Sequence, residues 1–153
     1  MSGAEPTTAT ATAPGRVPGC VFCDIAAGDL AASVVLRDDD VCAFLDGRPV
    51  FKGHVLVVPR AHVGTLLDAT PGQLAAVFGA AQRVARALGS GLSADGSFLG
   101  VNTKISQSVP HLHVHVVPRR RKDGLRGFFW PRVPYASDEE REEIAGRIRA
   151  ALT

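Results

Sequence analysis

Three of the five histidines in this 153-residue chain stand in one pentapeptide, His111-Leu112-His113-Val114-His115. In an extended strand alternate side chains point to the same face, so these imidazoles are expected to line one face at intervals of about 6.6 Å. Aligned imidazoles suit metal ligation, or nucleophilic and acid-base work in which one ring reacts and its neighbours orient it. A merely polar strand face is the alternative, which Leu112 and Val114 disfavour because they fix the register.

Cysteines are the second group of side chains suited to chemistry. Cys20 and Cys23 form a Cys-x-x-Cys pair, which is half of a four-coordinate metal site, and the alternative is a pair of small packed thiols. Three cysteines is an odd count, and the first 19 residues lack the apolar core of a secretory signal, so a disulfide framework is not expected. The expected compartment is the cytoplasm, where thiols stay reduced. Cys42 lies in an apolar run and is expected in the core.

Short strands are the elements that must position these side chains. Apolar runs between turn-forming residues predict strands at 34–36, 41–45, 53–59, 97–102 and 112–117. They outnumber the helices that the sequence predicts and do not alternate regularly with them. This order predicts an antiparallel α+β domain.

Two helices are expected beside the strands. Thr70 is placed as an N-cap, Pro71 takes the first helical position, and apolar residues recur at helical spacing until Gly89. Ser137 and Glu140 have the spacing of a capping box, which predicts a second helix that closes the chain.

The composition limits the class of protein. With 46% hydrophobic and 21% charged residues the chain suits one globular domain, and the lack of a long uncharged apolar run argues against a membrane protein. Residues 1–19, rich in Ala, Thr, Pro and Gly, are expected to form a flexible tail before a domain at 20–153. A net charge of +2 is too small to argue for nucleic acid, although residues 119–132 hold six Lys or Arg side chains against one Asp.

The ordered motifs of the chain resemble the histidine triad (HIT) family. The resemblance is carried by the stretch from Gln107 to Arg119 with its alternating histidines, by Cys20-Val21-Phe22-Cys23, by Phe44-Leu45-Asp46 and by the stretch from Gly53 to His62. Such an ordered set, spread over roughly residues 20–120, is more specific than the pentapeptide alone. It implies a HIT-like five-stranded antiparallel sheet with two helices, usually paired into a homodimer. It also implies a nucleotide hydrolase or nucleotidyl transferase with a purine nucleotide as substrate.

The resemblance assigns catalytic roles to three of the five histidines. His113 is implied as the nucleophile that attacks the α-phosphate of an AMP-linked substrate, such as a phosphoramidate or a dinucleoside polyphosphate, giving a nucleotidyl-histidine. An imidazole attacks through one nitrogen when an acceptor holds the N–H of the other, and a backbone carbonyl is expected as that acceptor. His115, His54 and Ser108 are implied as donors to the phosphate.

The substrate contacts are likewise implied by the resemblance. By itself Asp46 before Gly47 suits a turn, and only its place in the family pattern assigns it to the ribose hydroxyls. Apolar positions that would sandwich the base are ordinary core positions when viewed singly. The implied contacts are Asp46 with the ribose, Gln107 and Asn102 with the phosphate or leaving group, and Phe22, Ile25, Leu30, Phe44 and Leu56 with the base.

A zinc-containing branch of the family implies a use for the cysteine pair. In that branch His62 and His111 complete the set with Cys20 and Cys23, and a closed Cys₂His₂ set is typical of structural zinc. No catalytic metal is then required.

Two segments depart from the family pattern or lie outside it. Residues 102–107 lack the glycines that many members carry in this loop. In residues 119–132 the aromatic run Phe128 to Trp130 stands among arginines, which suits either stacking on a base and gripping a polyphosphate or a core or dimer patch beside solvated charges. Three other functions stay open. The basic aromatic segment suits an enzyme acting on adenylated nucleic-acid ends. The other two are a nucleotide-binding regulatory module with a slow His113 and a metal-dependent hydrolase that uses all three histidines of the pentapeptide.

Overall fold

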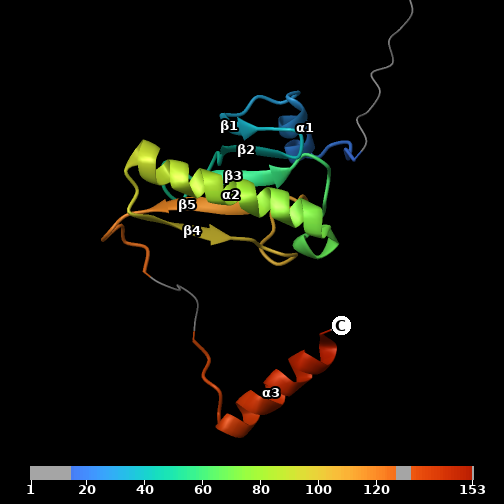
Figure 1. Cartoon of the computed structure of the whole chain (residues 1–153), viewed down its shortest axis with the longest axis vertical. Coiled ribbons are helices and arrows are strands. Elements are labelled where there is room, and N and C mark those ends of the chain that lie inside the picture. The colour runs from blue at the N-terminus through green and yellow to red at the C-terminus, as the bar shows by residue number, and fades with distance from the viewer. Residues whose placement is uncertain (1–14, 127–131, 153) are drawn as a thin grey trace, which may run out of the picture. The chain divides into compact units, whose positions relative to one another are not determined.

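Five antiparallel strands form one sheet in the computed structural model, which describes residues 15–126 and 132–152 (Figure 1). The order across the sheet is β1-β2-β3-β5-β4. The strands are β1 Val34–Arg37, β2 Val41–Leu45, β3 Val55–Pro59, β4 Gly96–Gly100 and β5 Val114–Arg119. The predicted α+β class and antiparallel sheet are confirmed, and every predicted strand end lies within two residues of the observed one.

The two faces of the sheet follow from the two-residue period of its strands. In β2 and β3, Val41, Ala43, Val55 and Val57 face the long helix α2, Pro71–Leu92, which crosses one side of the sheet (Figure 1). Their neighbours in sequence point to the opposite face, where they pack with the residues of the short helix α1, Val21–Ala27. Those neighbours are Cys42, Phe44, Leu56 and Val58.

Helix α2 begins as predicted and ends later than predicted. The Thr70 side chain accepts a hydrogen bond from the Gln73 N–H, and Pro71 is the first helical residue. The helix passes through Gly89 because a glycine costs a helix interior only about 1 kcal/mol, which the burial of Leu88 offsets. It ends at Ser93, whose left-handed backbone has a φ of 54°.

The described residues contain three α-helices, where the sequence predicted two. The helix not foreseen is α1, which has only seven residues and whose N-cap, Cys20, makes no capping hydrogen bond through its side chain. It lacks the local signals of a helix and is stabilised by burying Phe22, Cys23 and Ile25 against the sheet. A single 3₁₀ turn, Leu66–Asp68, precedes α2.

The residues from Lys122 onward form a separate compact unit. Its helix α3, Asp138–Ala151, begins at the predicted cap, where the Ser137 side chain accepts from the Glu140 N–H. The capping box is incomplete, because the Glu140 carboxylate accepts from the Ala136 N–H instead. The predicted aromatic patch at 128–130 lies outside the described residues. No described helix has the length and apolar character needed to cross a membrane.

The described chain is already held against the sheet domain at Gly15, five residues before the boundary expected from composition. The Gly15 carbonyl accepts from the His62 N–H. Arg16 forms ion pairs of 2.9 Å with both Asp24 and Asp29. These contacts fix the approach of the chain to Cys20.

Candidate active site and metal site

The three histidine rings of the pentapeptide follow one another along one side of the chain: the Phe22 ring lies 6.0 Å from the His111 ring and 5.2 Å from the His113 ring, and the His113 and His115 rings lie 5.0 Å apart. Strand β5 begins at Val114, so His111 and His113 precede it and only His115 lies within it. These contacts agree with the expectation that the imidazoles line one face, although the paired strand starts two residues later than the apolar pattern suggested. His111 is fully buried and His113 nearly so, which also excludes a polar surface strand.

A backbone carbonyl orients the His113 ring, as predicted from the sequence. The His113 Nδ1–H donates to the carbonyl oxygen of His111 at 2.8 Å. A carbonyl can only accept, so Nδ1 carries the proton and the lone pair of a neutral ring lies on Nε2. The edge-to-face ring of Phe22, 5.2 Å from the His113 ring centre, packs against it. The ring is held in the form that can attack an electrophile through Nε2.

His54 and His115 form a hydrogen-bonded chain. The Val50 N–H donates to His54 Nδ1 at 3.2 Å, so the neutral His54 ring carries its proton on Nε2. That Nε2–H donates to His115 Nδ1 at 3.0 Å. The remaining ring proton of His115 is therefore on Nε2, where it is a donor. Through these two hydrogen bonds the Val50 amide orients the His115 ring. The expectation that His54 donates to the phosphate is not met, because both of its ring nitrogens are engaged within the protein and it does not line the cavity described below.

The surroundings keep this histidine chain neutral. Burial lowers the pKa of His54, against the opposing effect of Asp46. Burial, reinforced by the neighbouring His113 and His54, lowers the pKa of His115 to about 4. Asp46 Oδ2 lies 3.6 Å from His54 Nδ1, and Asp46, His54 and His115 form a second group whose atoms could hold a metal ion.

These lowered values predict an acid-sensitive stability. The folded state holds His115 neutral while the unfolded chain, with its ordinary pKa of 6.5, takes up a proton, so stability falls as the pH drops from about 6.5 towards 4. Between pH 7.5 and 5, His115→Gln is expected to lose about 2 kcal/mol less stability than the wild type, since glutamine does not titrate. Denaturant unfolding of both proteins at the two pH values measures this difference. An equal loss in both would show that His115 does not contribute to the acid sensitivity.

A cavity of about 1000 Å³ lies on the α1 face of the sheet, beside the histidines. Its apolar wall includes Phe22 and Phe44, whose rings meet edge to face at 5.4 Å. The predicted site residues that line it are Phe22, Ile25, Phe44, Leu56, Asp46, Ser108, His113 and His115. A groove of this size, apolar on one side and with imidazoles at one end, suits a nucleoside with its phosphate at the histidines.

Asp46 forms the turn that its place before Gly47 suggested, and it also lines the cavity. Its Oδ1 accepts from the Arg48 N–H at 2.8 Å, which is an aspartate turn. The same residue lines the cavity, so lone pairs remain for a ligand hydroxyl.

Three predicted substrate contacts are not brought to the cavity wall. Leu30 is 44% exposed and Asn102 is also exposed, and neither lines the cavity. Gln107 is engaged within the protein: its Oε1 accepts from the Lys104 N–H at 3.0 Å and its Nε2 donates to the Gly64 carbonyl at 2.7 Å. Gln107 therefore braces the loop that leads to Ser108.

The loop without glycine folds by placing other residues in left-handed conformations. Lys104 and Ser106 have φ values of 66° and 59°, a region that glycine adopts at lower cost. The hydrogen bonds of Gln107 hold this turn. The loop after β3 supports it further, since the Leu112 N–H donates to the Val63 carbonyl at 2.6 Å.

Part of the cavity wall was not predicted from the sequence. Val21, Val109 and residues 31–33 lie in loops or at helix starts whose patterns carry no signal of a site. Arg48 is a further lining residue that was not foreseen. Its only sequence signal is its position two residues after Asp46.

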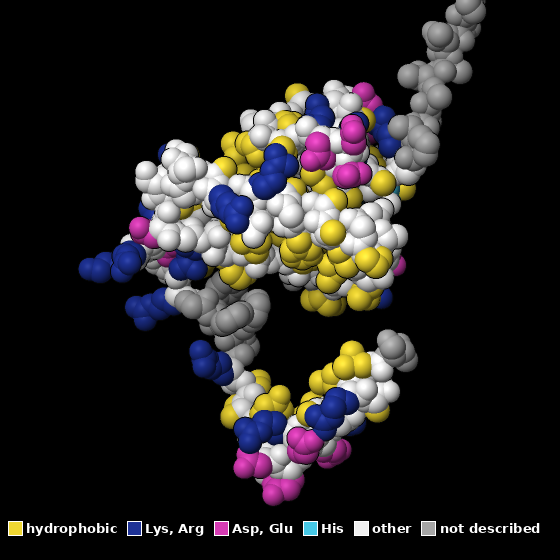
Figure 2. All heavy atoms as spheres, in the orientation of Figure 1, with side chains coloured by type: hydrophobic (Ala, Val, Ile, Leu, Met, Phe, Trp, Pro, Cys, Tyr) yellow, Lys and Arg dark blue, Asp and Glu magenta, His cyan; other side chains and the backbone are white. Residues whose placement is uncertain are grey.

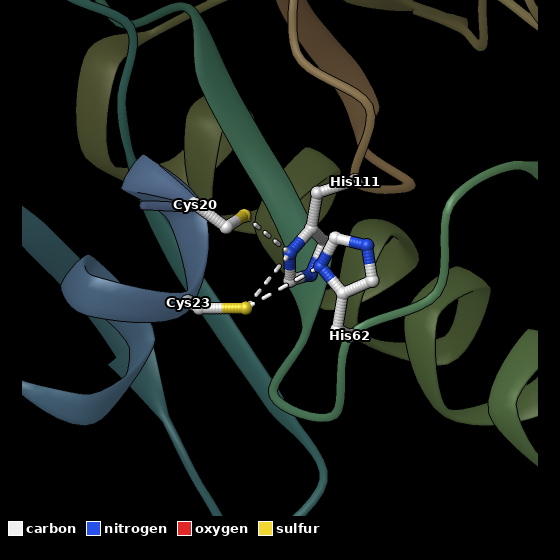
Figure 3. Close-up of side chains that lie close together, drawn as sticks. All are labelled: Cys20, Cys23, His62 and His111. Atoms are coloured by element: carbon white, nitrogen blue, oxygen red, sulfur yellow. Dashed lines mark hydrogen bonds between the residues drawn. The ribbon is translucent and has the colours of Figure 1, made fainter. Parts of the chain in front are cut away.

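The cysteine pair meets the two remaining histidines, as the resemblance implied (Figure 3). The four side chains point toward one another from α1, from the loop after β3 and from the segment before β5 (Figure 3). Cys20 Sγ lies 3.3 Å from His111 Nδ1, and Cys23 Sγ lies 3.4 Å from His62 Nδ1 and 3.6 Å from His111 Nδ1. This cluster could hold a metal ion.

The geometry of the cluster agrees with a tetrahedral ion. Zn–S bonds of about 2.3 Å and Zn–N bonds of about 2.0–2.1 Å at tetrahedral angles separate sulfur from nitrogen by about 3.5 Å. The His111 Nε2–H donates to the Pro59 carbonyl at 2.8 Å, which leaves the Nδ1 lone pair directed at the sulfurs. Burial lowers the pKa of His111 to about 4, so this ring is neutral, as a ligand must be. Cys42, by contrast, is fully buried in the core, as predicted.

The fold and this arrangement of histidines define a known class. Residues 27–122 match the HIT domain family, and the chain belongs to that family. Protein hit of Bacillus subtilis is 35% identical over 131 residues, which cover 82% of this chain and 86% of that protein. Adenosine 5'-monophosphoramidase hnt1 of Schizosaccharomyces pombe is 30% identical over 134 residues, 85% of this chain and 98% of that protein. The asymmetrical bis(5'-nucleosyl)-tetraphosphatase of the same yeast is 34% identical over 96 residues, 61% of this chain and 53% of that protein.

Solved structures of the same class share the fold. A HIT family protein from Bacillus anthracis is similar with a TM-score of 0.79 and 30% identity, over 90% of this chain and 100% of that one. A Zn-bound histidine triad family protein from Mycobacterium smegmatis is similar with a TM-score of 0.68 and 36% identity, over 87% of this chain and 97% of that one.

Proposed function

We propose that this protein is a nucleotide phosphohydrolase or nucleotidyl transferase that cleaves an AMP-linked substrate at its α-phosphate through a nucleotidyl-His113 intermediate. The observation that carries the proposal is the His113 ring in the cavity wall, with its Nδ1–H bound to the His111 carbonyl and its Nε2 lone pair available. The named activities of the two yeast relatives support a phosphoramidate or a dinucleoside polyphosphate as the substrate class.

The reaction has two balanced steps. His113 Nε2 attacks the α-phosphorus, the bond from phosphorus to the leaving group breaks, and the leaving group departs with the electron pair and takes a proton from the site. Water then attacks the same phosphorus, the P–Nε2 bond breaks, AMP is released and the proton returns. With another acceptor in place of water the second step is a transfer.

The other side chains at this end of the cavity stabilise the charge that develops on the phosphate. His115 presents Nε2–H as a donor, oriented through His54, and the Ser108 hydroxyl lines the same cavity. Because these donors are in place before the reaction, they need no reorganisation during it.

We further propose that the metal site holds a structural zinc ion, ligated by Cys20, Cys23, His62 and His111. Four protein ligands close a tetrahedral site, and the ion then cross-links α1 to the segment that carries His113. The Zn-bound mycobacterial neighbour supports this assignment.

Incubation with adenosine phosphoramidate and with diadenosine tetraphosphate tests the function. AMP release, with an acid-labile adenylyl adduct in the intact mass of the protein, is the expected result. Nucleotide binding without turnover of either compound would instead support the regulatory module. The described residues offer little support for an enzyme that acts on adenylated nucleic-acid ends. The Lys and Arg side chains over α2 stand apart from one another (Figure 2), and Arg120 donates a hydrogen bond to the Leu92 carbonyl.

Asp46 is expected to bind the ribose in this reaction. Asp46→Ala should raise the Kd of AMP about tenfold, the cost of one charge-assisted hydrogen bond. The same substitution should change the Kd of the 2',3'-dideoxy analogue much less, because that analogue has no hydroxyl to donate. Calorimetric titration with both nucleotides measures the two values. Equal losses for both would assign Asp46 a purely structural role in its turn.

A further inference from the structure

One permanently charged cation lies in the described wall of the nucleotide cavity. Among the residues that line it, only Arg48 has a Lys or Arg side chain. It stands in the loop between β2 and β3, next to Gly47, where an added Cβ would meet no atom within 4 Å. The wall beside Arg48 is therefore open and leaves room for a ligand group.

Contacts on both sides place this loop beside the histidine chain. On one side, Asp46 Oδ1 accepts from the Arg48 N–H at 2.8 Å, and Asp46 Oδ2 lies 3.6 Å from His54 Nδ1. On the other side, the Val50 N–H donates to the same His54 nitrogen. The backbone of Arg48 is thus fixed between two residues that touch His54, which itself contacts His115.

Apart from Arg48, the charged and titratable side chains described above offer an anionic ligand no positive charge. Asp46 is acidic, and burial lowers the pKa values of His54 and His115, so the pair supplies hydrogen-bond donors and no positive charge. The Arg48 guanidinium makes no hydrogen bond or ion pair with the described residues, and its side chain is exposed at the cavity. A substrate with a second anionic group beyond the reacting phosphate meets Arg48 as its only fixed counter-charge there.

We propose that Arg48 is a specificity-determining residue that binds an anionic leaving group, so that the preferred substrates join AMP to a phosphate chain or another oxyanion and not to an amine. This inference rests on the proposed function, because it divides the substrate class of the same site. A guanidinium suits the task because its planar donors match phosphate oxygens in pairs.

The test compares two substrates in four proteins. For Arg48→Gln, kcat/KM for diadenosine tetraphosphate should fall about five- to tenfold, mainly through KM, as expected for a cation at the mouth of a site. The value for adenosine phosphoramidate should stay within about twofold. Arg48→Lys should lie between, since lysine keeps the charge and loses the paired geometry. Arg86→Gln, an exposed arginine on α2 away from the cavity, is the matched control and should change neither value.

A binding measurement separates failure of this inference from failure of the proposed function. ATP carries two more phosphates than AMP, so the wild type should bind ATP more tightly than AMP, and Arg48→Gln should reduce that preference by the same factor. An unchanged preference, or an unchanged ratio of the two kcat/KM values, overturns the role of Arg48. If the wild type turns over neither substrate but still binds ATP more tightly than AMP, and Arg48→Gln removes this preference, then the proposed function alone is overturned.

Discussion

His113→Ala is expected to reduce AMP release at least about a thousandfold, because the variant lacks the atom that forms the bond to phosphorus. Water would have to attack the substrate directly, assisted only by the donors His115 and Ser108. No adenylyl adduct should appear in the intact mass of the variant. Steady-state turnover and rapid acid quench, each with the same substrate and wild-type protein, measure both effects.

The loss must be separated from unfolding of the site. The His113 side chain accounts for part of one cavity wall and its Nδ1–H for one hydrogen bond, so the sheet should persist. Metal content and AMP affinity are expected to stay within about threefold of the wild-type values. His115→Gln is the matched comparison: it keeps the nucleophile, so it should slow turnover about a hundredfold and still form the adduct. A His113→Ala protein that keeps more than a tenth of the activity would contradict covalent catalysis at this residue.

Removal of the metal is expected to have the largest effect on stability. The double variant Cys20→Ser, Cys23→Ser should contain no zinc and be about 3 kcal/mol less stable than the wild type, which corresponds to a Tm lower by about 10 °C. The cause is the loss of the proposed cross-link through the ion between α1 and the segment before β5. Elemental analysis and thermal unfolding, with and without a chelator, measure the two changes.

The same variant should also bind nucleotide less tightly. Phe22 in α1 forms part of the apolar wall, and the carbonyl that orients His113 belongs to His111, one of the four proposed ligands. Release of the ion therefore loosens two walls of the cavity at once. Cys42→Ala is the matched control, since it removes a buried thiol outside the cluster and should keep the zinc. A wild-type protein that purifies without zinc, and whose Tm a chelator does not change, would leave Cys20 and Cys23 as packed thiols.

The chain's own amino-acid sequence determined the sheet and the identity of the reactive side chains. Apolar side chains at every position of β2 and β3 predict strands buried on both faces, and the two-residue period of a strand separates these side chains into the two sets that the structure shows on opposite faces. Thr70 and Pro71 start α2 through contacts within one turn, so that helix was also predictable. The concentration of histidine around His113 pointed to the site for the same reason: residue type and short spacing are visible without coordinates.

Only the tertiary structure decided how those side chains divide their work. Helix α1 forms because Phe22 and Ile25 find apolar partners on the sheet, and no signal within its seven residues anticipates that. His111 and His113 differ in role because Cys20 and Cys23 pack beside His111, whereas the cavity opens beside His113. The tautomers of His54 and His115 depend on the amide of Val50. The Gln107 side chain donates to the carbonyl of Gly64, in a loop far away in the sequence. Hydrogen bonds and burial between segments far apart in sequence set these roles, so a pattern of residues can name the groups of the site but cannot assign their partners.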